Sequence, residues 1–331
     1  MTCSTRGAAE PLLRIEALRT EFPTNAGPVR AVDGLDLTIG SGEILGLVGE
    51  SGCGKTVTAL SVLGLVDRPG RVTGGAIRFG ETDLLALPPA RMAAIRGERI
   101  AMIFQQPRGS LNPVMRIGSQ IAEQFIRRRA LGRAEAWARA VALLRAVGIP
   151  APESGARAYP HEISGGQAQR VMIAIALALE PQLLIADEPT TALDVTVQAQ
   201  VLALLRERCR TLGTALMLVT HDLGVVAQLA DRVTVMYAGH AVETAPVASL
   251  FARPMHPYTQ GLLAAIPRPG ENRERLAEIP GSVALATQTG CRFAARCTER
   301  TRLHLGRCEN EMPPLVPRPD GGMVRCWAAQ S

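Results

Sequence analysis

A glycine-rich segment with a single lysine is the part of the sequence best suited to phosphate chemistry. Residues 49–56 read GESGCGKT and fit the pattern GxxxxGK[ST]. Glycines let backbone N–H groups turn inward around phosphates, and the helix that follows adds its partial positive end. In this pattern the lysine reaches the β- and γ-phosphates and the hydroxyl binds Mg²⁺. The predicted nucleotide-binding residues are Gly49, Glu50, Ser51, Gly52, Cys53, Gly54, Lys55 and Thr56.

Lys55 stands out because every other basic residue in the chain, apart from the five histidines, is an arginine. An ammonium group is a compact point charge that fits between phosphate oxygens, whereas a guanidinium group is planar and forked. The composition therefore indicates a steric requirement for lysine at position 55. Cys53 occupies a variable position of the pattern, where its thiol could make the loop sensitive to thiol reagents.

Two carboxylates follow a short apolar run and are suited to metal binding and hydrolysis. Residues 183–186 read LLIA, and Asp187 and Glu188 come directly after them. A carboxylate at the end of a strand beside the phosphate loop can hold Mg²⁺ through a water. We assign that role to Asp187, and we expect Glu188 to polarise the water that attacks the γ-phosphate. The alternative is a pair of solvated acids after a core strand.

His221 and Gln105 each follow another apolar run and are candidates for the same site. His221 could contact the γ-phosphate and orient Glu188 or the water, although a lone histidine is often structural. The amide of Gln105 could contact Mg²⁺ or the attacking water. The predicted catalytic residues are Glu188, His221 and Gln105, and the predicted Mg²⁺ ligands are Thr56, Gln105 and Asp187.

A second candidate anion site begins the long apolar helix expected over residues 164–179. Its first residues are Ser164, Gly165, Gly166 and Gln167, which we call the signature segment. Ser164 is suited to capping the helix, and the two glycines leave N–H groups exposed at its positive end. A plain helix start is the alternative interpretation.

The elements that must position these residues alternate along the chain. Strands are expected at 43–48, 99–104, 183–186, 214–220 and 232–237, and helices at 55–65, 194–211 and 223–230. This alternation indicates a mainly parallel sheet with helices on both faces. A helical stretch at about 90–165 interrupts it, and the proline-rich sequence after about 245 is typical of an appended tail.

Composition narrows the class of protein. No run approaches the ~18 apolar residues of a membrane span, and residues 1–10 lack the apolar core of a secretion signal. We therefore expect a soluble, cytoplasmic chain that can sit on a membrane through a partner. The net charge of +6 is consistent with a solvated basic surface or with contact to acidic lipids or a partner. The aromatic content of 3% weighs against base stacking, so no nucleic-acid partner is expected.

The order of these motifs resembles the ATP-binding subunits of ABC transporters. The phosphate loop comes first, followed by FQQP with Gln105, ISGGQ at 163–167, Asp187 and Glu188, TALD at 191–194, and His221. The resemblance covers residues 12–245. It implies an α/β P-loop NTPase (RecA-like) with an antiparallel β subdomain, the inserted helical subdomain and a C-terminal extension. Ile163 stands where leucine or phenylalanine is commoner in the family.

The resemblance also implies roles for further residues. In that family two subunits form a head-to-tail dimer, and each ATP lies between one phosphate loop and the partner's signature segment. Ser164, Gly165, Gly166 and Gln167 would then act on the partner's ATP, and Asp194 would belong to the loop that links the two sites. Phe22 is similar to the aromatic residue that stacks on adenine in the family.

Residues 246–331 narrow the family further. The segment RPMHPYTQGLL at 253–263 resembles the tail of importers for dipeptides, oligopeptides and related solutes such as nickel. Such importers use two ATP-binding subunits (generally different chains), two transmembrane permease subunits and an extracytoplasmic solute-binding protein. Some of their tails bind a [4Fe–4S] cluster through four cysteines. Cys291, Cys297, Cys308 and Cys326 resemble that set, and zinc or free thiols remain the alternatives.

The sequence therefore predicts an ATPase subunit that energises import, peripheral on the cytoplasmic face of the inner membrane. The main alternative is a soluble ABC ATPase that acts on ribosomes or DNA. That class usually shows two cassettes in one chain or a long coiled coil, neither of which is evident. A purely regulatory nucleotide binder is disfavoured because Glu188 and His221 are both present.

Overall fold

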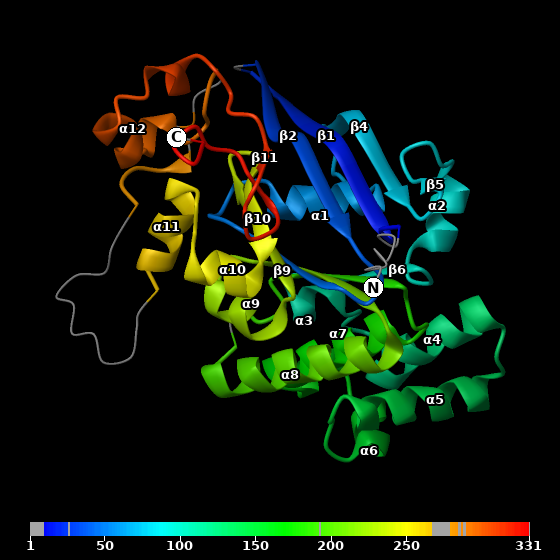
Figure 1. Cartoon of the computed structure of the whole chain (residues 1–331). Helices are drawn as coiled ribbons and strands as arrows, with labels where there is room; N and C mark the ends of the chain where they lie inside the picture. The colour runs from blue at the N-terminus through cyan, green and yellow to red at the C-terminus, as the bar shows by residue number, and fades with distance from the viewer. Residues whose placement is uncertain are drawn as a thin grey trace, which may run out of the picture.

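The computed structural model describes residues 10–25, 27–191, 193–266, 279–283, 286 and 289–330. Its centre is an eight-stranded sheet in the order β11-β12-β10-β9-β3-β8-β7-β6, shown in Figure 1. The five strands from β9 to β6 run parallel, and β10, β12 and β11 continue the sheet antiparallel. The strands are β3 Ile44–Val48, β6 Ile100–Ile103, β7 Leu183–Asp187, β8 Ala215–Thr220, β9 Arg232–Tyr237, β10 His240–Pro246, β11 Val316–Pro317 and β12 Met323–Val324.

A second, antiparallel sheet lies above the first, with the order β2-β1-β4-β5. It consists of β1 Leu13–Thr24, β2 Gly27–Ile39, β4 Arg71–Phe79 and β5 Thr82–Asp83. The helix α1 (Lys55–Leu63) contacts β1 and β2 on one side and β7 and β8 on the other. The phosphate loop therefore leads into a helix that is enclosed by both sheets.

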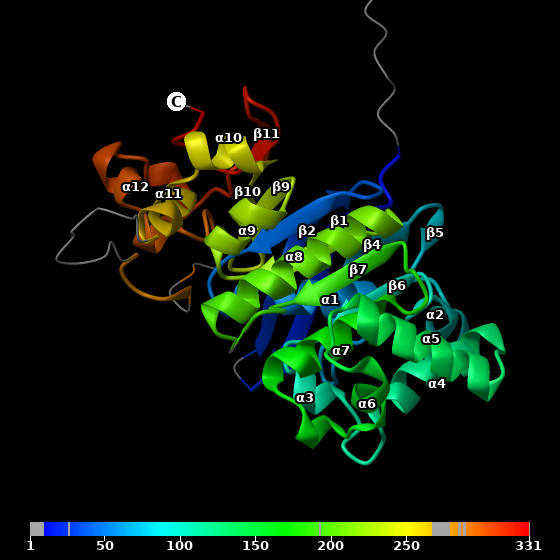
Figure 2. The same cartoon turned by 90° about the horizontal axis from the view of Figure 1, so that it is seen from below.

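The remaining helices cover the other face of the central sheet or form the two appended parts. Figure 1 shows α7 (Gly165–Leu177) and α8 (Val195–Leu212) beneath this sheet, and in Figure 2, seen from below, α8 crosses in front of it. The other helices are α2 Pro89–Ile95, α3 Pro107–Ser110, α4 Ile117–Arg129, α5 Arg133–Ala146, α6 Pro152–Arg157, α9 Leu223–Leu229, α10 Val247–Ala252, α11 Pro257–Ala264 and α12 Thr298–Arg302. None of the described helices is long and apolar enough to cross a membrane.

The parallel strands are buried on both faces, which explains their continuous apolar sequences. In β3, Leu45 and Leu47 pack towards α1 and the antiparallel sheet, while Ile44 and Val48 pack towards the opposite core. That second core includes the helices of the insertion. Side chains alternate between the two cores because successive residues of a strand point to opposite faces.

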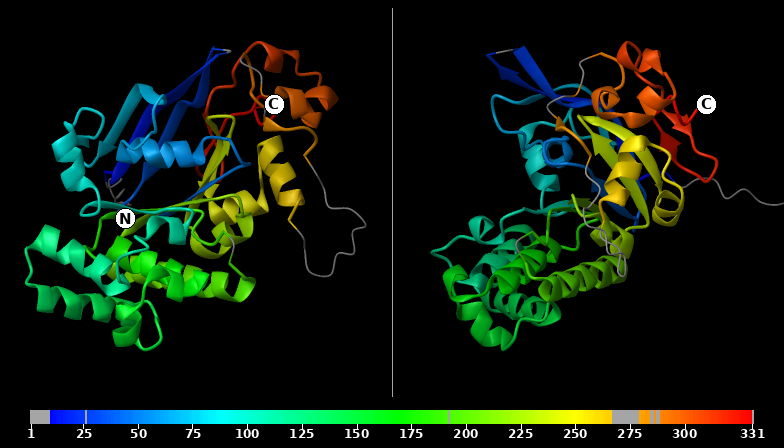
Figure 3. Two further views of the ribbon diagram at one scale, coloured as in Figure 1. Left: turned by 180° about the vertical axis from the view of Figure 1, so that it is seen from behind. Right: turned by 90° about the vertical axis from the view of Figure 1, so that its left-hand side faces the viewer.

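The architecture matches the predicted mainly parallel sheet with an antiparallel subdomain and a helical insertion. Two boundaries differ from expectation. The strand expected at 99–104 is present as β6 and pairs with β7 in the central sheet, so the helical insertion begins after this strand and not at about residue 90. The tail expected to be irregular contributes β12, whose Val324 pairs with Glu243 of β10. In Figure 3 the C-terminal extension lies at the opposite end of the molecule from α4 and α5.

Candidate nucleotide-binding and hydrolysis site

The phosphate loop passes so close to neighbouring backbone that two of its glycines cannot carry a side chain. A Cβ on Gly49 would lie 2.2 Å from the carbonyl oxygen of Met236, and one on Gly54 would lie 2.2 Å from that of Ala31. Gly54 also has a φ of +105°, which favours glycine. The curvature of the loop is therefore set by its packing between β9 and β2.

Lys55 is buried and held over the loop by backbone oxygens. Its Nζ donates to the carbonyl oxygens of Gly49 at 2.7 Å and Glu50 at 3.0 Å, and the residue is only 6% exposed. These bonds keep the ammonium group against the phosphate loop, where a compact positive charge can bind phosphate oxygens. Cys53 is fully buried beneath the loop, and this burial raises the pKa of its thiol. This burial weighs against the expected sensitivity of Cys53 to thiol reagents.

Thr56 and Asp187 meet between the start of α1 and the end of β7. The Oγ1 of Thr56 lies 3.2 Å from Oδ1 of Asp187 and donates to it. Burial raises the pKa of Asp187, and the neighbouring Glu188 carboxylate adds to the rise, while Thr56 and Lys55 oppose it. A divalent cation would favour the ionised form of this carboxylate. The pair therefore has the donor atoms and the electrostatics expected of an Mg²⁺ site.

Glu188 is held by three side chains that come from three different segments. Its Oε2 accepts hydrogen bonds from Nε2 of Gln105 at 2.7 Å and from Oγ1 of Thr191 at 2.9 Å. Its Oε1 lies 3.0 Å from Nδ1 of His221. Two of the other predicted residues, Gln105 and His221, are thus brought together with Thr191 at the carboxylate of Glu188, which follows Asp187 in the chain.

The backbone and the pKa of Glu188 both suit a group that acts on water. Its φ is +47°, an unusual value for a residue with a side chain, and its N–H donates to the carbonyl oxygen of Val219 at 2.8 Å. Burial alone would raise the pKa of Glu188, but hydrogen bonds from His221, Thr191 and Gln105 hold it below its usual range. The carboxylate is therefore ionised at neutral pH and able to accept a proton.

Thr191 also holds the Glu188 carboxylate, although in the sequence it was noted only as part of TALD. Its hydroxyl bonds Glu188 from three positions further along the chain. A serine or threonine three residues after an acid can form such a bond, so the spacing was available in the sequence. The pattern alone did not show that the chain turns back at this point.

The signature segment forms a capping box in which Ser164 and Gly165 are exposed and Gly166 and Gln167 are half-buried. Oγ of Ser164 accepts from the Gln167 N–H at 3.2 Å, and Oε1 of Gln167 accepts from the Ser164 N–H at 3.0 Å. A Cβ on Gly166 would lie 2.7 Å from the side chain of Val197, so α7 starts against α8. Gly165 has open space around it and lines a cavity of about 500 Å³ together with Gln105 and Thr191.

Asp194 and Phe22 make contacts other than those around Glu188. Asp194 caps α8, and its Oδ1 accepts from the Val197 N–H at 3.0 Å. Phe22 lies on β1 and its ring covers Gly70, where a Cβ would be 2.4 Å from the ring. Because Gly70 has no side chain, the Phe22 ring can lie directly against the backbone at position 70.

The four cysteines of the extension are free of disulfides. Burial raises the pKa of Cys291 to about 12, the Phe293 N–H opposes the rise, and the thiols of Cys308, Cys326 and Cys297 add to it. The N–H of Cys291 also donates to the carbonyl oxygen of Cys308 at 2.8 Å. Within the described part of the chain, no three His, Cys, Asp or Glu residues are close enough for a single metal ion.

Comparisons with known proteins agree with this geometry. The family described as "ABC transporter" matches residues 32–191, and "Oligopeptide/dipeptide transporter, C-terminal region" matches residues 242–302. A solved dimeric ATP-binding cassette, MJ0796, in a post-hydrolysis state bound to ADP and Pi is 27% identical. The match covers 71% of this chain and 98% of that chain with a TM-score of 0.64. The predicted P-loop NTPase fold and ATPase activity are confirmed by these matches.

Two relatives are similar along nearly their whole length. The oligopeptide transport ATP-binding protein AppD of Bacillus subtilis is 47% identical, over 96% of this chain and 96% of the relative. The oligopeptide transport ATP-binding protein OppD of Salmonella typhimurium is 45% identical, over 96% of this chain and 94% of the relative. The chain therefore belongs to the family of ABC transporter ATP-binding subunits that carry the oligopeptide/dipeptide C-terminal region.

Proposed function

We propose that this chain binds and hydrolyses ATP to energise the import of dipeptides or oligopeptides through a membrane ABC transporter. The observation that carries the proposal is the attachment of the oligopeptide/dipeptide C-terminal region to a cassette whose Glu188 has Gln105, Thr191 and His221 around it. A regulatory nucleotide binder would not need such a group. The relatives named for oligopeptide transport support the choice of solute class.

The geometry supports a direct role for Glu188 in hydrolysis. Its ionised carboxylate would orient the attacking water and accept a proton from it, while His221 and Gln105 fix the direction of its oxygens. Lys55 would balance charge on the β- and γ-phosphates. Mg²⁺, when bound, would draw charge from the phosphates and would be held by Thr56, Gln105 and Asp187. Because Gln105 uses its Nε2 on Glu188, its Oε1 remains for this purpose.

A second ATP-binding subunit would complete the site. Ser164 and Gly165 of the signature segment are exposed at the start of α7, where the partial positive end of the helix suits a partner's phosphate. ATP binding would close two subunits over two nucleotides, and hydrolysis would reopen them. Phe22 would stack on adenine, and Asp194 would lie in the loop between the two sites. We propose that this partner is a different chain, as the resemblance implies.

Transport of a peptide across a membrane would require further partner proteins. Two transmembrane permease subunits would convert the opening and closing of the ATP-binding pair into alternating access, and an extracytoplasmic solute-binding protein would deliver the peptide. This chain would then sit peripherally on the cytoplasmic face of the membrane, with residues 12–245 as the ATPase domain and residues 246–331 as the extension. The helical insertion would dock the permeases.

Co-purification tests this assembly. A tagged form of the chain, expressed with its neighbouring genes and extracted in detergent, is expected to retain two membrane subunits and a second cassette. Gel filtration with mass spectrometry of the peak would measure the composition. Stable association with ribosomes and no membrane subunit would favour the soluble alternative and contradict the proposal.

We also propose that the four cysteines bind a [4Fe–4S] cluster. The support is that the extension carries four free cysteines, Cys291, Cys297, Cys308 and Cys326, and thiolates of four cysteines are the ligands of such a cluster. Burial raises the pKa of Cys326 to about 11, and the N–H groups of Ala329 and Ala328 oppose that rise by bonding the sulfur. Amides directed at cysteine sulfur are typical of cluster sites.

Metal analysis of protein purified without oxygen tests the cluster. We expect a brown protein with about four irons and four sulfides per chain. Cys308→Ser should lose this iron because one of the four thiolate ligands is removed. Cys209→Ser is the matched control, since Cys209 is another buried cysteine but lies in α8, and it should keep the iron. A colourless preparation containing zinc would contradict the proposal.

A further inference from the structure

One residue of the phosphate loop is held from outside the ATPase fold by both its backbone and its side chain. The N–H of Glu50 donates to the hydroxyl oxygen of Tyr258 at 2.9 Å. The Glu50 carboxylate binds Arg296 through two hydrogen bonds, Nη1 to Oε2 at 2.8 Å and Nη2 to Oε1 at 3.0 Å. Tyr258 and Arg296 both belong to the C-terminal extension. Neither contact was foreseen from the loop motif, which treats Glu50 as a variable position.

Arg296 is fixed in place by the extension before it reaches the loop. Its side chain is 3% exposed, and its Nε donates to the carbonyl oxygen of Pro280 at 2.7 Å. Its Nη2 also donates to the carbonyl oxygen of Ile279 at 3.1 Å, and the guanidinium lies 5.7 Å from the ring centroid of Tyr237. A guanidinium with this many partners has little freedom to turn away. It therefore presents a rigid, two-pronged cation to Glu50.

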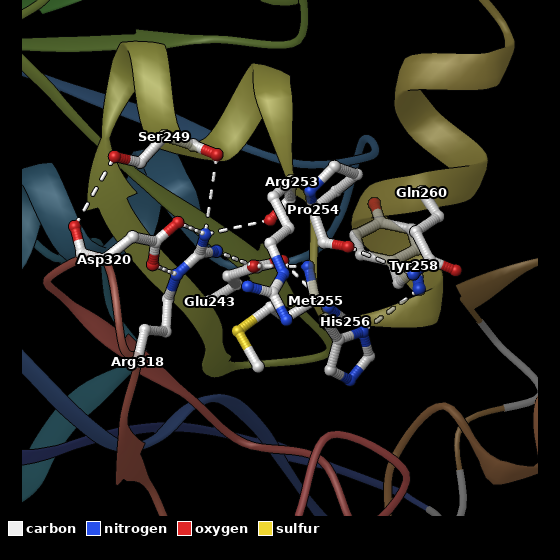
Figure 4. A network of polar contacts seen from close by, with 10 residues as sticks. All are labelled: Glu243, Ser249, Arg253, Pro254, Met255, His256, Tyr258, Gln260, Arg318 and Asp320. Carbon is white, nitrogen blue, oxygen red and sulfur yellow. Dashed lines mark hydrogen bonds and ion pairs between the residues drawn. The ribbon is translucent and has the colours of Figure 1, made fainter.

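Tyr258 is positioned by a buried chain of polar contacts, drawn in Figure 4. The Tyr258 N–H donates to Nδ1 of His256 at 3.0 Å, and the His256 N–H donates to Oε2 of Glu243 at 3.0 Å. Burial lowers the pKa of His256 to about 3, so the ring is neutral and its Nδ1 can accept. The start of α11 is thereby tied to β10.

The far end of this chain of contacts is the C-terminal hairpin of β11 and β12. Arg318 and Glu243 form an ion pair in which both side chains are fully buried, and Arg318 also bonds Asp320 at 2.8 Å. A buried charge needs such partners because removing it from water is costly. The hairpin thus fixes Glu243, which fixes the turn before Tyr258. The segment HPYT, which the sequence analysis used only as a family marker, has this physical role.

The charge of Glu50 gives the Arg296 contact a consequence for ATP. An unpaired carboxylate in a loop that must receive a triphosphate would repel it, and a paired one repels it much less. The two bonds to Arg296 offset the charge and draw the carboxylate towards the extension. The bond to Tyr258 holds the backbone at the same residue, two positions before Gly52 of the loop.

We propose that Arg296 and Tyr258 are positioning residues for the phosphate loop, so that the affinity for ATP depends on the C-terminal extension. In this proposal neither Arg296 nor Tyr258 touches the nucleotide. Each acts through Glu50, one by neutralising and orienting its carboxylate and the other by holding its backbone. This inference rests on the proposed nucleotide site and adds a means by which the extension controls that site.

A double-mutant cycle on the full chain tests the charge argument. The dissociation constant of a fluorescent ATP analogue would be measured for wild type, Arg296→Gln, Glu50→Gln and the double variant. Arg296→Gln is expected to weaken binding about tenfold because it leaves the Glu50 charge unpaired. In the Glu50→Gln background the same change should alter the constant by less than about twofold, since no charge remains to be neutralised. A purely structural arginine would cost as much in both backgrounds, and that result would overturn the inference.

The rate of ATP turnover and a matched control variant provide a second test of the role of Arg296. The loss in Arg296→Gln should appear in KM for ATP, with kcat at saturating ATP within about threefold of wild type, as expected when binding alone is affected. Arg302→Gln is the control because Arg302 is a neighbouring, exposed arginine that pairs with Glu299. It should bind ATP as wild type does. An equal loss in Arg302→Gln would attribute the effect to general disturbance of the extension and would contradict the inference.

Tyr258→Phe keeps the test decisive if Arg296→Gln does not fold. This variant removes only the hydroxyl and keeps the ring that packs on Tyr237 and Phe293. It should weaken ATP binding about threefold or more because the Glu50 N–H loses its acceptor. Wild-type affinity in Tyr258→Phe would overturn its assigned role. If wild type itself binds no ATP, the proposed function fails instead, so the two failures are distinguishable.

Discussion

Glu188→Gln is expected to bind ATP with nearly unchanged affinity and to hydrolyse it about 100- to 1,000-fold more slowly. The side chain keeps its shape, and its amide oxygen can still accept from Gln105 and Thr191 at the place of Oε2. The amide nitrogen can donate to Nδ1 of His221 at the place of Oε1. The arrangement is therefore retained, while the group that accepts the proton of water is lost.

Phosphate release at saturating ATP, measured beside the dissociation constant of ATP, checks this expectation. Glu207→Gln is a matched control, since Glu207 is an exposed glutamate on α8 whose ion-pair partner is Arg208. It should turn over as wild type does. Hydrolysis by Glu188→Gln within about threefold of wild type would remove Glu188 from its assigned role and leave the water without an identified base.

Lys55→Arg is expected to weaken ATP binding about 100-fold although the charge is conserved. The Lys55 ammonium sits between the carbonyl oxygens of Gly49 and Glu50 with 6% of the residue exposed. A planar guanidinium is larger and cannot enter that space without moving the loop. The loop itself has little room, because a Cβ on Gly49 would already lie 2.2 Å from the backbone of Met236.

Calorimetric titration with ATP would measure this loss, and thermal unfolding would show whether the variant remains folded. Arg139→Lys exchanges the same two residue types in the opposite direction on the exposed face of α5, where the partner is Glu135. It should leave ATP binding unchanged. Equal affinity in wild type and Lys55→Arg would show that position 55 needs only a positive charge, against the steric argument.

The parts of the site that were predictable are those encoded in short, contiguous segments. The phosphate loop, the capping of α8 by Asp194 and the carboxylates after β7 depend on neighbouring residues, so local spacing reports them. Gln105 and His221 were candidates because each follows a predicted strand, and parallel strands end at one edge of a sheet. Because Glu188 follows a strand that ends at the same edge, their side chains can reach it.

The contacts that were not predictable join distant segments. Glu50 meets Tyr258 and Arg296 across 208 and 246 positions of sequence, and no periodicity relates them. The strand β12 has two residues, too short for an alternating pattern, and its pairing with β10 depends on the buried ion pair of Arg318 and Glu243. Composition and spacing describe segments, whereas these features arise from how segments pack.

ATP-dependent peptide uptake tests the central claim most directly. The chain would be expressed with its partner subunits and reconstituted into vesicles with the solute-binding protein and a labelled oligopeptide. We predict uptake that requires ATP on the side where this chain is exposed and that stops in Glu188→Gln. Peptide uptake that continues without ATP, or that is unchanged in Glu188→Gln, would contradict the assignment of this chain as the subunit that powers import.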